Sequence, residues 1–184
     1  MGNVQSEQYT AEEAYELLLE SPAELVKGEL IEMVRPGARH GIVCGEVTFL
    51  LKQWNKHAQL GKIATNDSGV VTERGPDTVR GPDIYFIQNR RLPDGAPTGW
   101  VEVVPDLCIE VLSPNDRWSD VMSKVDEFLA AGAAEVWVID PDLRAVHVVR
   151  GDSPLQVYRN NDSLTSSVLP EFECQVADLF VECD

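Results

Sequence analysis

The sequence predicts an α/β or α+β fold in which a mixed central β-sheet is flanked by helices. Two long segments carry apolar residues at helical spacing, and the shorter segments around them show the alternating or continuous apolar pattern of strands. Their order along the chain is helix–strand–helix, several strands, helix and further strands, which is typical of helices covering a mixed sheet. Because 184 residues is an ordinary length for one domain, we expect residues 1–184 to form a single domain, with the polar residues 1–9 flexible.

The N-terminal half begins with a capping box. Thr10 at the cap and Glu13 three residues later open a short helix that ends near Glu20. A longer helix, ended by Gly61, is indicated by an apolar stripe that consists of Val43, Val47, Leu50, Leu51 and Trp54. The elements expected here are helices at 11–20 and 39–58, a strand at 30–34, and a hairpin of 62–65 and 69–72 around a turn at 66–68.

The C-terminal half contains one further helix among several strands. Its apolar stripe consists of Val121, Val125, Phe128 and Leu129, and Gly132 ends it. The elements expected here are strands at 83–87, 105–112, 135–140, 145–150, 155–158 and 163–169, a polar loop at 88–98, a helix at 117–131 and a closing apolar pair at 179–180.

The composition is that of an ordinary globular protein, with 43% hydrophobic and 25% charged residues. No apolar run approaches the ~18 residues that a membrane span needs, and the N-terminus lacks the pattern of a signal peptide. We therefore expect a cytoplasmic protein with no membrane partner. The four cysteines show no zinc-ligand spacing, and the apolar surroundings of Cys44, Cys108 and Cys174 predict small core residues.

The net charge of −16 is unfavourable for binding nucleic acid, which usually depends on Lys and Arg neutralising phosphates. A nucleic-acid substrate therefore requires a locally basic surface, or metal ions that offset part of the carboxylate charge. The arginines expected to contact phosphates are Arg74, Arg80, Arg90 and Arg91.

The segment 104–114 is the most informative part of the chain, because it predicts a buried strand that carries acids. Leu107, Ile109 and Val111 alternate onto one face, and Glu110 lies amid the apolar run. Burying an unpaired charge costs several kcal/mol, so Glu110 needs a partner such as a divalent metal or a structural ion pair. A second strand begins with Pro82-Asp83, as the first begins with Pro105-Asp106, so two or three carboxylates can converge.

Two charged side chains fall on helix faces where leucine would be expected, namely Glu46 and Lys124. A cluster of carboxylates with one lysine is the equipment of a metal-dependent phosphodiesterase, in which acids hold Mg²⁺ and the lysine stabilises charge in the transition state. From the residues alone, purely structural roles for these side chains remain open. Lys124 can extend into solvent or pair with Asp120, Glu46 can be solvated, and each Pro-Asp can cap its strand.

These motifs together resemble one family over nearly the whole chain, from about Thr10 to Phe180. Pro82-Asp83-Ile84, the run from Pro105 to Pro114, and Asp120-x3-Lys124-x3-Phe128-x3-Gly132-x2-Glu135-Val136-Trp137 are similar to the Uma-two family of putative restriction endonucleases. That family belongs to the PD-(D/E)XK nuclease superfamily. The resemblance implies a restriction-endonuclease-like fold and a Mg²⁺-dependent site, with Mn²⁺ as a substitute.

Carried onto this sequence, the resemblance implies that Asp83, Glu110 and Lys124 are catalytic. Asp83, Glu110, the Val111 carbonyl and Glu46 are the implied metal ligands. The sequence departs from the superfamily pattern where the lysine two residues after Glu110 is replaced by Leu112, and Lys124 on the following helix supplies the cation instead. His40 matches a recurring family histidine, for which a helix N-cap or core role is expected, and Asp106 is expected to be structural or outer-shell.

The predicted function is hydrolysis of phosphodiester bonds in nucleic acid, DNA in the first instance, by a protein that can form a homodimer. The alternative is a non-catalytic binding or scaffold protein that retains the nuclease fold, which the charge of −16 favours. A third reading is a hydrolase of small phosphate esters, for which a small, enclosed pocket would be the distinguishing feature.

Overall fold

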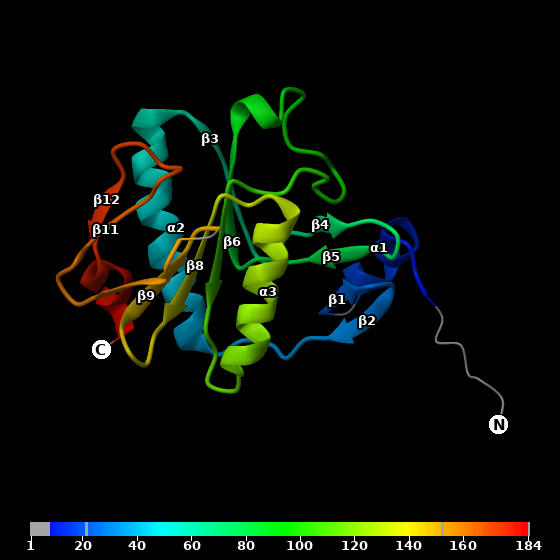
Figure 1. The fold of residues 1–184 in the computed structure, drawn as a ribbon, viewed down its shortest axis with the longest axis horizontal. Coiled ribbons are helices and arrows are strands. Elements are labelled where there is room, and N and C mark those ends of the chain that lie inside the picture. The colour runs from blue at the N-terminus through cyan, green and yellow to red at the C-terminus, as the bar shows by residue number, and fades with distance from the viewer. Residues whose placement is uncertain (1–7, 21, 152, 184) are drawn as a thin grey trace.

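A six-stranded mixed sheet forms the centre of the protein (Figure 1). The computed structural model describes residues 8–20, 22–151 and 153–183, so the expected flexibility of residues 1–7 lies outside the described residues. The strand order is β10-β9-β8-β7-β6-β3, and all neighbours are antiparallel except β7 and β8. The strands are β3 (Gly61–Thr65), β6 (Ile84–Gln88), β7 (Leu107–Val111), β8 (Glu135–Asp140), β9 (Ala145–Val149) and β10 (Gln156–Arg159).

A long helix covers each face of this sheet, as the apolar patterns predict. Residues Leu107, Ile109 and Val111 of β7 join the core beneath α2 (Ala38–Ala58), whereas Cys108 packs with the core beneath α3 (Trp118–Ala131). The helix α3 is the crossover between the parallel strands β7 and β8. The C-terminal segment, with β11 (Ser163–Thr165), β12 (Glu173–Gln175) and η2 (Val176–Cys183), closes the α2 side of the core.

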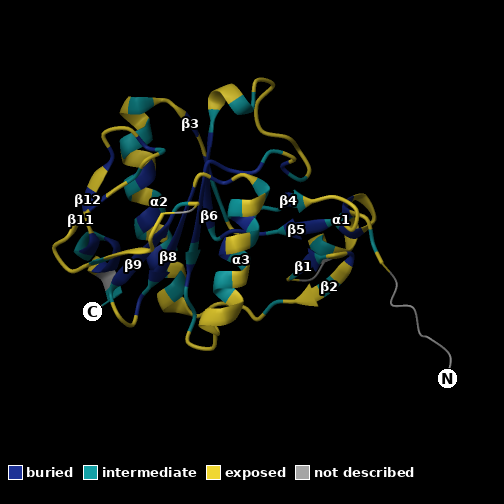
Figure 2. Cartoon of the chain, viewed as in Figure 1, coloured by how far each residue is buried: buried dark blue, intermediate teal, exposed yellow. Residues whose placement is uncertain are grey.

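A smaller antiparallel sheet lies beside the first and has the order β2-β1-β5-β4. Its strands are β1 (Ala23–Val26), β2 (Glu29–Glu32), β4 (Val70–Glu73) and β5 (Thr78–Arg80). The helix α1 (Ala11–Glu20) packs against it, and Thr10 and Glu13 exchange the two hydrogen bonds of the predicted capping box. Figure 2 shows the buried residues along the strands and the exposed ones on the outer faces of the helices.

The connection from β3 to β4 differs from the prediction. The expected hairpin of 62–65 and 69–72 is wrong, because β3 pairs with β6 in the large sheet and β4 pairs with β5 in the small one. Asn66 and Asp67 both have positive φ and lead the chain from one sheet to the other. The strand β1 was not predicted, the loop after β6 contains the short helix η1 (Asn89–Arg91), and Gln59 rather than Gly61 ends α2.

No helix in the described part of the chain is long and apolar enough to cross a membrane.

Candidate active site

The pairing of β6 with β7 places two predicted acids opposite each other. Ile84 pairs with Ile109 in an antiparallel register, so Asp83 and Glu110, one residue further on each strand, face one another. Asp83 Oδ2 accepts a hydrogen bond of 2.6 Å from the amide of Val111, which fixes the Asp83 carboxylate against β7. The carboxylate of Asp83, which directly precedes β6, is therefore held by the backbone of β7.

Asp106 lies at the opposite end of this strand pair. Its Oδ2 accepts a hydrogen bond from the amide of Gln88 at 2.9 Å, and its Oδ1 lies 3.2 Å from Arg91. The two Pro-Asp motifs therefore do not converge, because antiparallel strands that each begin with the same motif carry it at opposite ends.

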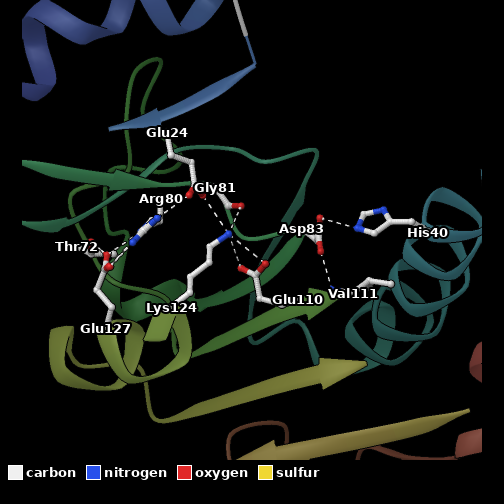
Figure 3. Close-up of polar contacts among 10 residues, drawn as sticks. All are labelled: Glu24, His40, Thr72, Arg80, Gly81, Asp83, Glu110, Val111, Lys124 and Glu127. Carbon is white, nitrogen blue, oxygen red and sulfur yellow. Dashed lines mark hydrogen bonds and ion pairs between the residues drawn. The ribbon is translucent and has the colours of Figure 1, made fainter. Parts of the chain in front are cut away.

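Lys124 reaches this acid pair from α3. Its Nζ lies 3.0 Å and 3.1 Å from the two carboxylate oxygens of Glu110, 3.0 Å from Glu24 and 3.4 Å from the carbonyl oxygen of Gly81 (Figure 3). Its side chain is only 14% exposed and runs past the ring of Phe128. The reading in which Lys124 extends into solvent is therefore wrong.

Glu24 was not predicted as a site residue. It is buried on β1, accepts a hydrogen bond from the amide of Gly81 at 2.9 Å and pairs with Arg80 at 2.8 Å. Arg80 also pairs with Glu127 at 2.6 Å, and Thr72 donates a hydrogen bond to that carboxylate. The signal that identified Glu110, an acid amid an apolar strand, is also present in Ala23-Glu24-Leu25.

His40 and Asp67 complete the polar cluster on the side of α2. His40 Nε2 lies 3.1 Å from Asp83 Oδ1. His40 is the third residue of α2 and the N-cap is Gly37, so the expected N-cap role is wrong. Asp67, from the turn between the two sheets, lies close enough to Asp83 to share a hydrogen bond with it.

Burial and the charges of neighbouring groups set the charge states of the Glu110–Lys124 pair. Burial raises the pKa of Glu110 to about 8; Lys124 opposes this rise, whereas Asp83 and Glu24 add to it. Burial acts to lower the pKa of Lys124, but the carboxylates of Glu110 and Glu24 outweigh it and raise that pKa. Lys124 therefore stays an ammonium at neutral pH, while Glu110 binds a proton more readily than an ordinary glutamate.

Burial, neighbouring charges and hydrogen bonds also shift the pKa values of the groups around this pair. Burial and the charge of Asp83 both raise the pKa of Asp67. Burial opposes the charged form of His40, but its hydrogen bond to Asp83 raises the pKa of His40 overall. Burial also opposes ionised Glu24, yet Lys124 and Arg80 lower its pKa. The cluster thus holds more carboxylates than cations.

The oxygen atoms around Asp83 and Glu110 fit a hard divalent cation. Lys124 Nζ forms a hydrogen bond with Glu110 Oε2 at 3.1 Å and an ion pair with Oε1 at 3.0 Å, and within the described residues the buried Oε1 accepts no hydrogen bond. The amide and carbonyl of one strand residue point to the same side, so the Val111 carbonyl faces Asp83 as its amide does. Carboxylate and carbonyl oxygens are the ligands that Mg²⁺ and Mn²⁺ prefer.

The structure does not bring Glu46 to this cluster. The α2 residues that line the hollow beside Asp83 are His40, Gly41, Cys44, Gly45 and Thr48, which share one helix face. Glu46 is half-buried and lies off that face. Its assignment as a metal ligand stays a prediction.

Two hollows meet at the cluster. One, of about 380 Å³, holds Asp83 and His40; the other, of about 650 Å³, is lined by Glu24, Arg80 and Gly81 on one side and by apolar side chains such as Met33 and Trp100 on the other. The two hollows share Pro36, Asn66 and Asp67. They therefore lie next to each other along one continuous surface.

Three of the four arginines expected to contact phosphates already form ion pairs. Arg74 contacts Glu12, Asp77 and Glu102, Arg80 contacts Glu24 and Glu127, and Arg91 contacts Asp106. Arg90 bonds the side chain of Gln88. Three of the four arginines therefore already have carboxylate partners, and their contact with phosphates stays a prediction. Arg35, which lines the larger hollow, is exposed and has no ion-pair partner among the described residues.

A mixed sheet with helices on both faces, facing acids on two adjacent strands and a lysine from the following helix defines a restriction-endonuclease-like nuclease fold. The comparisons agree with this class. The chain belongs to the Uma2 family, described as "putative restriction endonuclease", whose model matches residues 11–177.

A solved structure gives the same fold. It is a protein from Anabaena variabilis ATCC 29413, described as a putative nuclease belonging to DUF820, with a TM-score of 0.78 and 24% sequence identity. The match covers 94% of this chain and 98% of that one. The search of curated proteins finds no match.

Proposed function

We propose that the protein is a divalent-metal-dependent endonuclease that hydrolyses phosphodiester bonds in nucleic acid, DNA in the first instance. The observation that carries the proposal is the buried Lys124 ammonium, 3.0 Å from Glu110 on the strand edge that faces Asp83. An ammonium and two acids in one half-buried cluster cost desolvation free energy, which binding of a metal ion and a phosphate would offset. Membership of the Uma2 family supports the same reading.

Asp83, Glu110 and the Val111 carbonyl would hold the metal, Mg²⁺ or Mn²⁺. When bound there, the ion supplies Lewis-acid polarisation of the phosphate and a more acidic water. The protein's own contribution is to fix these oxygens: the Val111 amide orients Asp83, and the Lys124 ammonium lies against both carboxylate oxygens of Glu110.

Lys124 is the catalytic cation in this proposal. Attack of water forms one P–O bond, breaks the bond to the leaving sugar oxygen and concentrates negative charge on the phosphate. A fixed ammonium stabilises that charge most where it develops, in the transition state. Glu24 and the carbonyl of Gly81 hold Lys124 from the other side, so its position does not depend on Glu110 alone.

The test is an assay of plasmid, duplex and single-stranded DNA, and RNA, with Mg²⁺ or Mn²⁺ at low salt. We expect cleavage that needs the divalent metal, and a loss of about 10²–10³-fold in rate for Lys124→Ala, with metal affinity retained. Lys56→Ala, an exposed lysine in the last turn of α2, is the matched control and should keep the wild-type rate.

Two results would contradict this proposal. Absence of metal-dependent cleavage of every nucleic acid tested, in wild-type protein that binds Mn²⁺, would favour the non-catalytic binding protein. Equal cleavage by Lys124→Ala would remove Lys124 from the catalytic role.

A second function is favoured by one observation, the partly apolar hollow of about 650 Å³ beside a cluster whose arginines are already paired. That volume suits a single nucleotide or another small phosphate ester. Metal-dependent hydrolysis of a chromogenic phosphodiester, at a rate exceeding that on any polymer, would identify this function.

A further inference from the structure

Three potential metal ligands of a different chemical kind lie on the α2 side of the site. One nitrogen of His40, the sulfur of Cys44 and a carboxylate oxygen of Asp83 all lie within 4.8 Å of one another. His40 and Cys44 are one helical turn apart on α2, and Cys44 Sγ lies 3.6 Å from His40 Nδ1. Cys44 is therefore more than the core residue that its apolar context predicts.

Imidazole and thiolate are ligands of borderline and soft cations, whereas Mg²⁺ binds oxygen. We propose that His40, Cys44 and Asp83 form a binding site for a thiophilic divalent cation of the Zn²⁺ class. This site is distinct in its ligands from the oxygen site of Glu110 and the Val111 carbonyl, and the two share only Asp83.

The geometry suits an open site with three protein ligands. Around a tetrahedral ion with bonds of about 2.0–2.3 Å, neighbouring ligand atoms are about 3.3–3.8 Å apart. His40 Nε2 and Asp83 Oδ1 are already 3.1 Å apart, whereas Cys44 Sγ contacts the other ring nitrogen, Nδ1, so the Cys44 side chain must move towards Nε2 for all three to bind one ion. His40, Cys44 and Asp83 all line the hollow of about 380 Å³, which has room for a water molecule to complete the coordination.

The charge of the surroundings favours a cation at this position. Asp67 lines the same hollow and lies against Asp83, and Asp116 is close enough to interact with His40. Arg39, the nearest arginine on the same helix, is directed to Asp142. A bound cation would separate Asp83 from Asp67 electrostatically and relieve their repulsion.

Because both metal sites use Asp83, a thiophilic ion should regulate the metal-dependent cleavage. This consequence rests on the proposed function. An ion held by His40, Cys44 and Asp83 competes with Mg²⁺ or Mn²⁺ for Asp83, so Zn²⁺ should inhibit the metal-dependent cleavage. Binding of the thiophilic ion itself does not depend on whether the protein cleaves nucleic acid.

The experiment is a titration of the full-length protein with Co²⁺, whose thiolate complexes absorb in the near ultraviolet, followed by competition with Zn²⁺. We expect the wild type to show the charge-transfer band, and Cys44→Ser to lose it together with at least about tenfold in Zn²⁺ affinity. The Mn²⁺ affinity of Cys44→Ser should change by less than about twofold, since oxygen donors dominate Mn²⁺ binding.

Two control variants separate this site from the others. Cys183→Ser, which changes a half-buried cysteine in η2, should keep the band. Glu110→Gln should weaken Mn²⁺ binding and keep the band, because Glu110 belongs only to the oxygen site. If Cys44→Ser unfolds, Cys44→Ala replaces it, and alkylation of the wild type gives a further measure: Zn²⁺ should protect Cys44 and leave Cys183 reactive.

Absence of the band in the wild type, or an unchanged band in the Cys44 variants, would overturn the site. Equal loss of the band in Cys183→Ser would assign the sulfur ligand elsewhere and would overturn it too. A wild type that shows the band but cleaves no nucleic acid would count against the proposed function alone.

Discussion

At the scale of single residues, Glu110 shows how position rather than residue type decides the behaviour of a charge. It is an ordinary glutamate by sequence, but burial raises its pKa to about 8, against the opposing charge of Lys124. The folded state therefore binds a proton at Glu110 that the unfolded chain has released above its ordinary pKa near 4.5. Stability consequently falls as pH rises through this window, and the loss is complete above about pH 8.

Without metal, Glu110→Gln should remove this dependence of stability on pH. Gln cannot ionise, and Lys124 keeps Glu24 as its partner. We expect the variant to match the wild type near pH 5 and to exceed it near pH 8, by on the order of 1–3 kcal/mol in free energy of unfolding. Urea denaturation at several pH values in EDTA measures this. If the variant is strongly destabilised at every pH, Glu110 is a structural partner of Lys124.

At the scale of elements, the connection between β3 and β4 assembles the site. It carries Asp67 from the large sheet towards the small one, and its backbone packs tightly on Gly81. A Cβ atom on Gly81 would lie 2.7 Å from the carbonyl oxygen of Asp67, closer than real side chains come. Gly81 also donates its amide to Glu24 and accepts from Lys124, so this contact supports both.

Gly81→Ala should therefore damage both stability and function. The added methyl group must push the Asp67 backbone away, at a cost of about 1–3 kcal/mol, and the shift displaces the backbone groups that hold Glu24 and Lys124. Gly45→Ala is the contrasting variant: its Cβ meets open space within α2, so it should stabilise by about 0.5–1 kcal/mol. Chemical denaturation of both variants checks this, and equal effects in the two would refute the role of the close contact.

The sequence predicts the helices and strands better than it predicts which strands pair with each other. The apolar stripes and the alternation of Leu107, Ile109 and Val111 are local signals, and they give the mixed sheet and the helix on each face correctly. The contact of Lys124 with Glu110 follows from the same periodicities. Glu24 and Asp67 reach the site only because the chain divides between two sheets, and such long-range pairing leaves no periodic trace in the sequence.

At the scale of the whole molecule, a net charge of −16 and paired arginines limit how nucleic acid can bind. Each phosphate that a protein cation neutralises adds to the salt dependence of binding. If Arg74, Arg80, Arg90 and Arg91 all contacted phosphates, as the sequence predicts, the salt dependence of binding would be steep. The ion pairs of Arg74, Arg80 and Arg91 predict weak binding with a shallow salt dependence, unless a homodimer, which stays a prediction, presents cations from two subunits together.

The salt dependence of binding distinguishes a monomer with few unpaired cations from a homodimer that combines the cations of two subunits. With a labelled single strand in Ca²⁺, which fills oxygen sites, we expect the slope of log affinity against log salt to be shallower than about −2, since fewer than about three phosphates are neutralised. Arg35→Ala should reduce the slope further, because Arg35 is exposed beside the larger hollow. Arg74→Ala should leave the slope unchanged, because three acids already hold Arg74.

Fluorescence anisotropy from low to moderate salt measures the slope, and light scattering in the same buffers measures the mass. A slope steeper than about −4 in a monomer would mean that arginines exchange their carboxylates for phosphates on binding, and the same slope in a dimer would place the missing cations across two subunits.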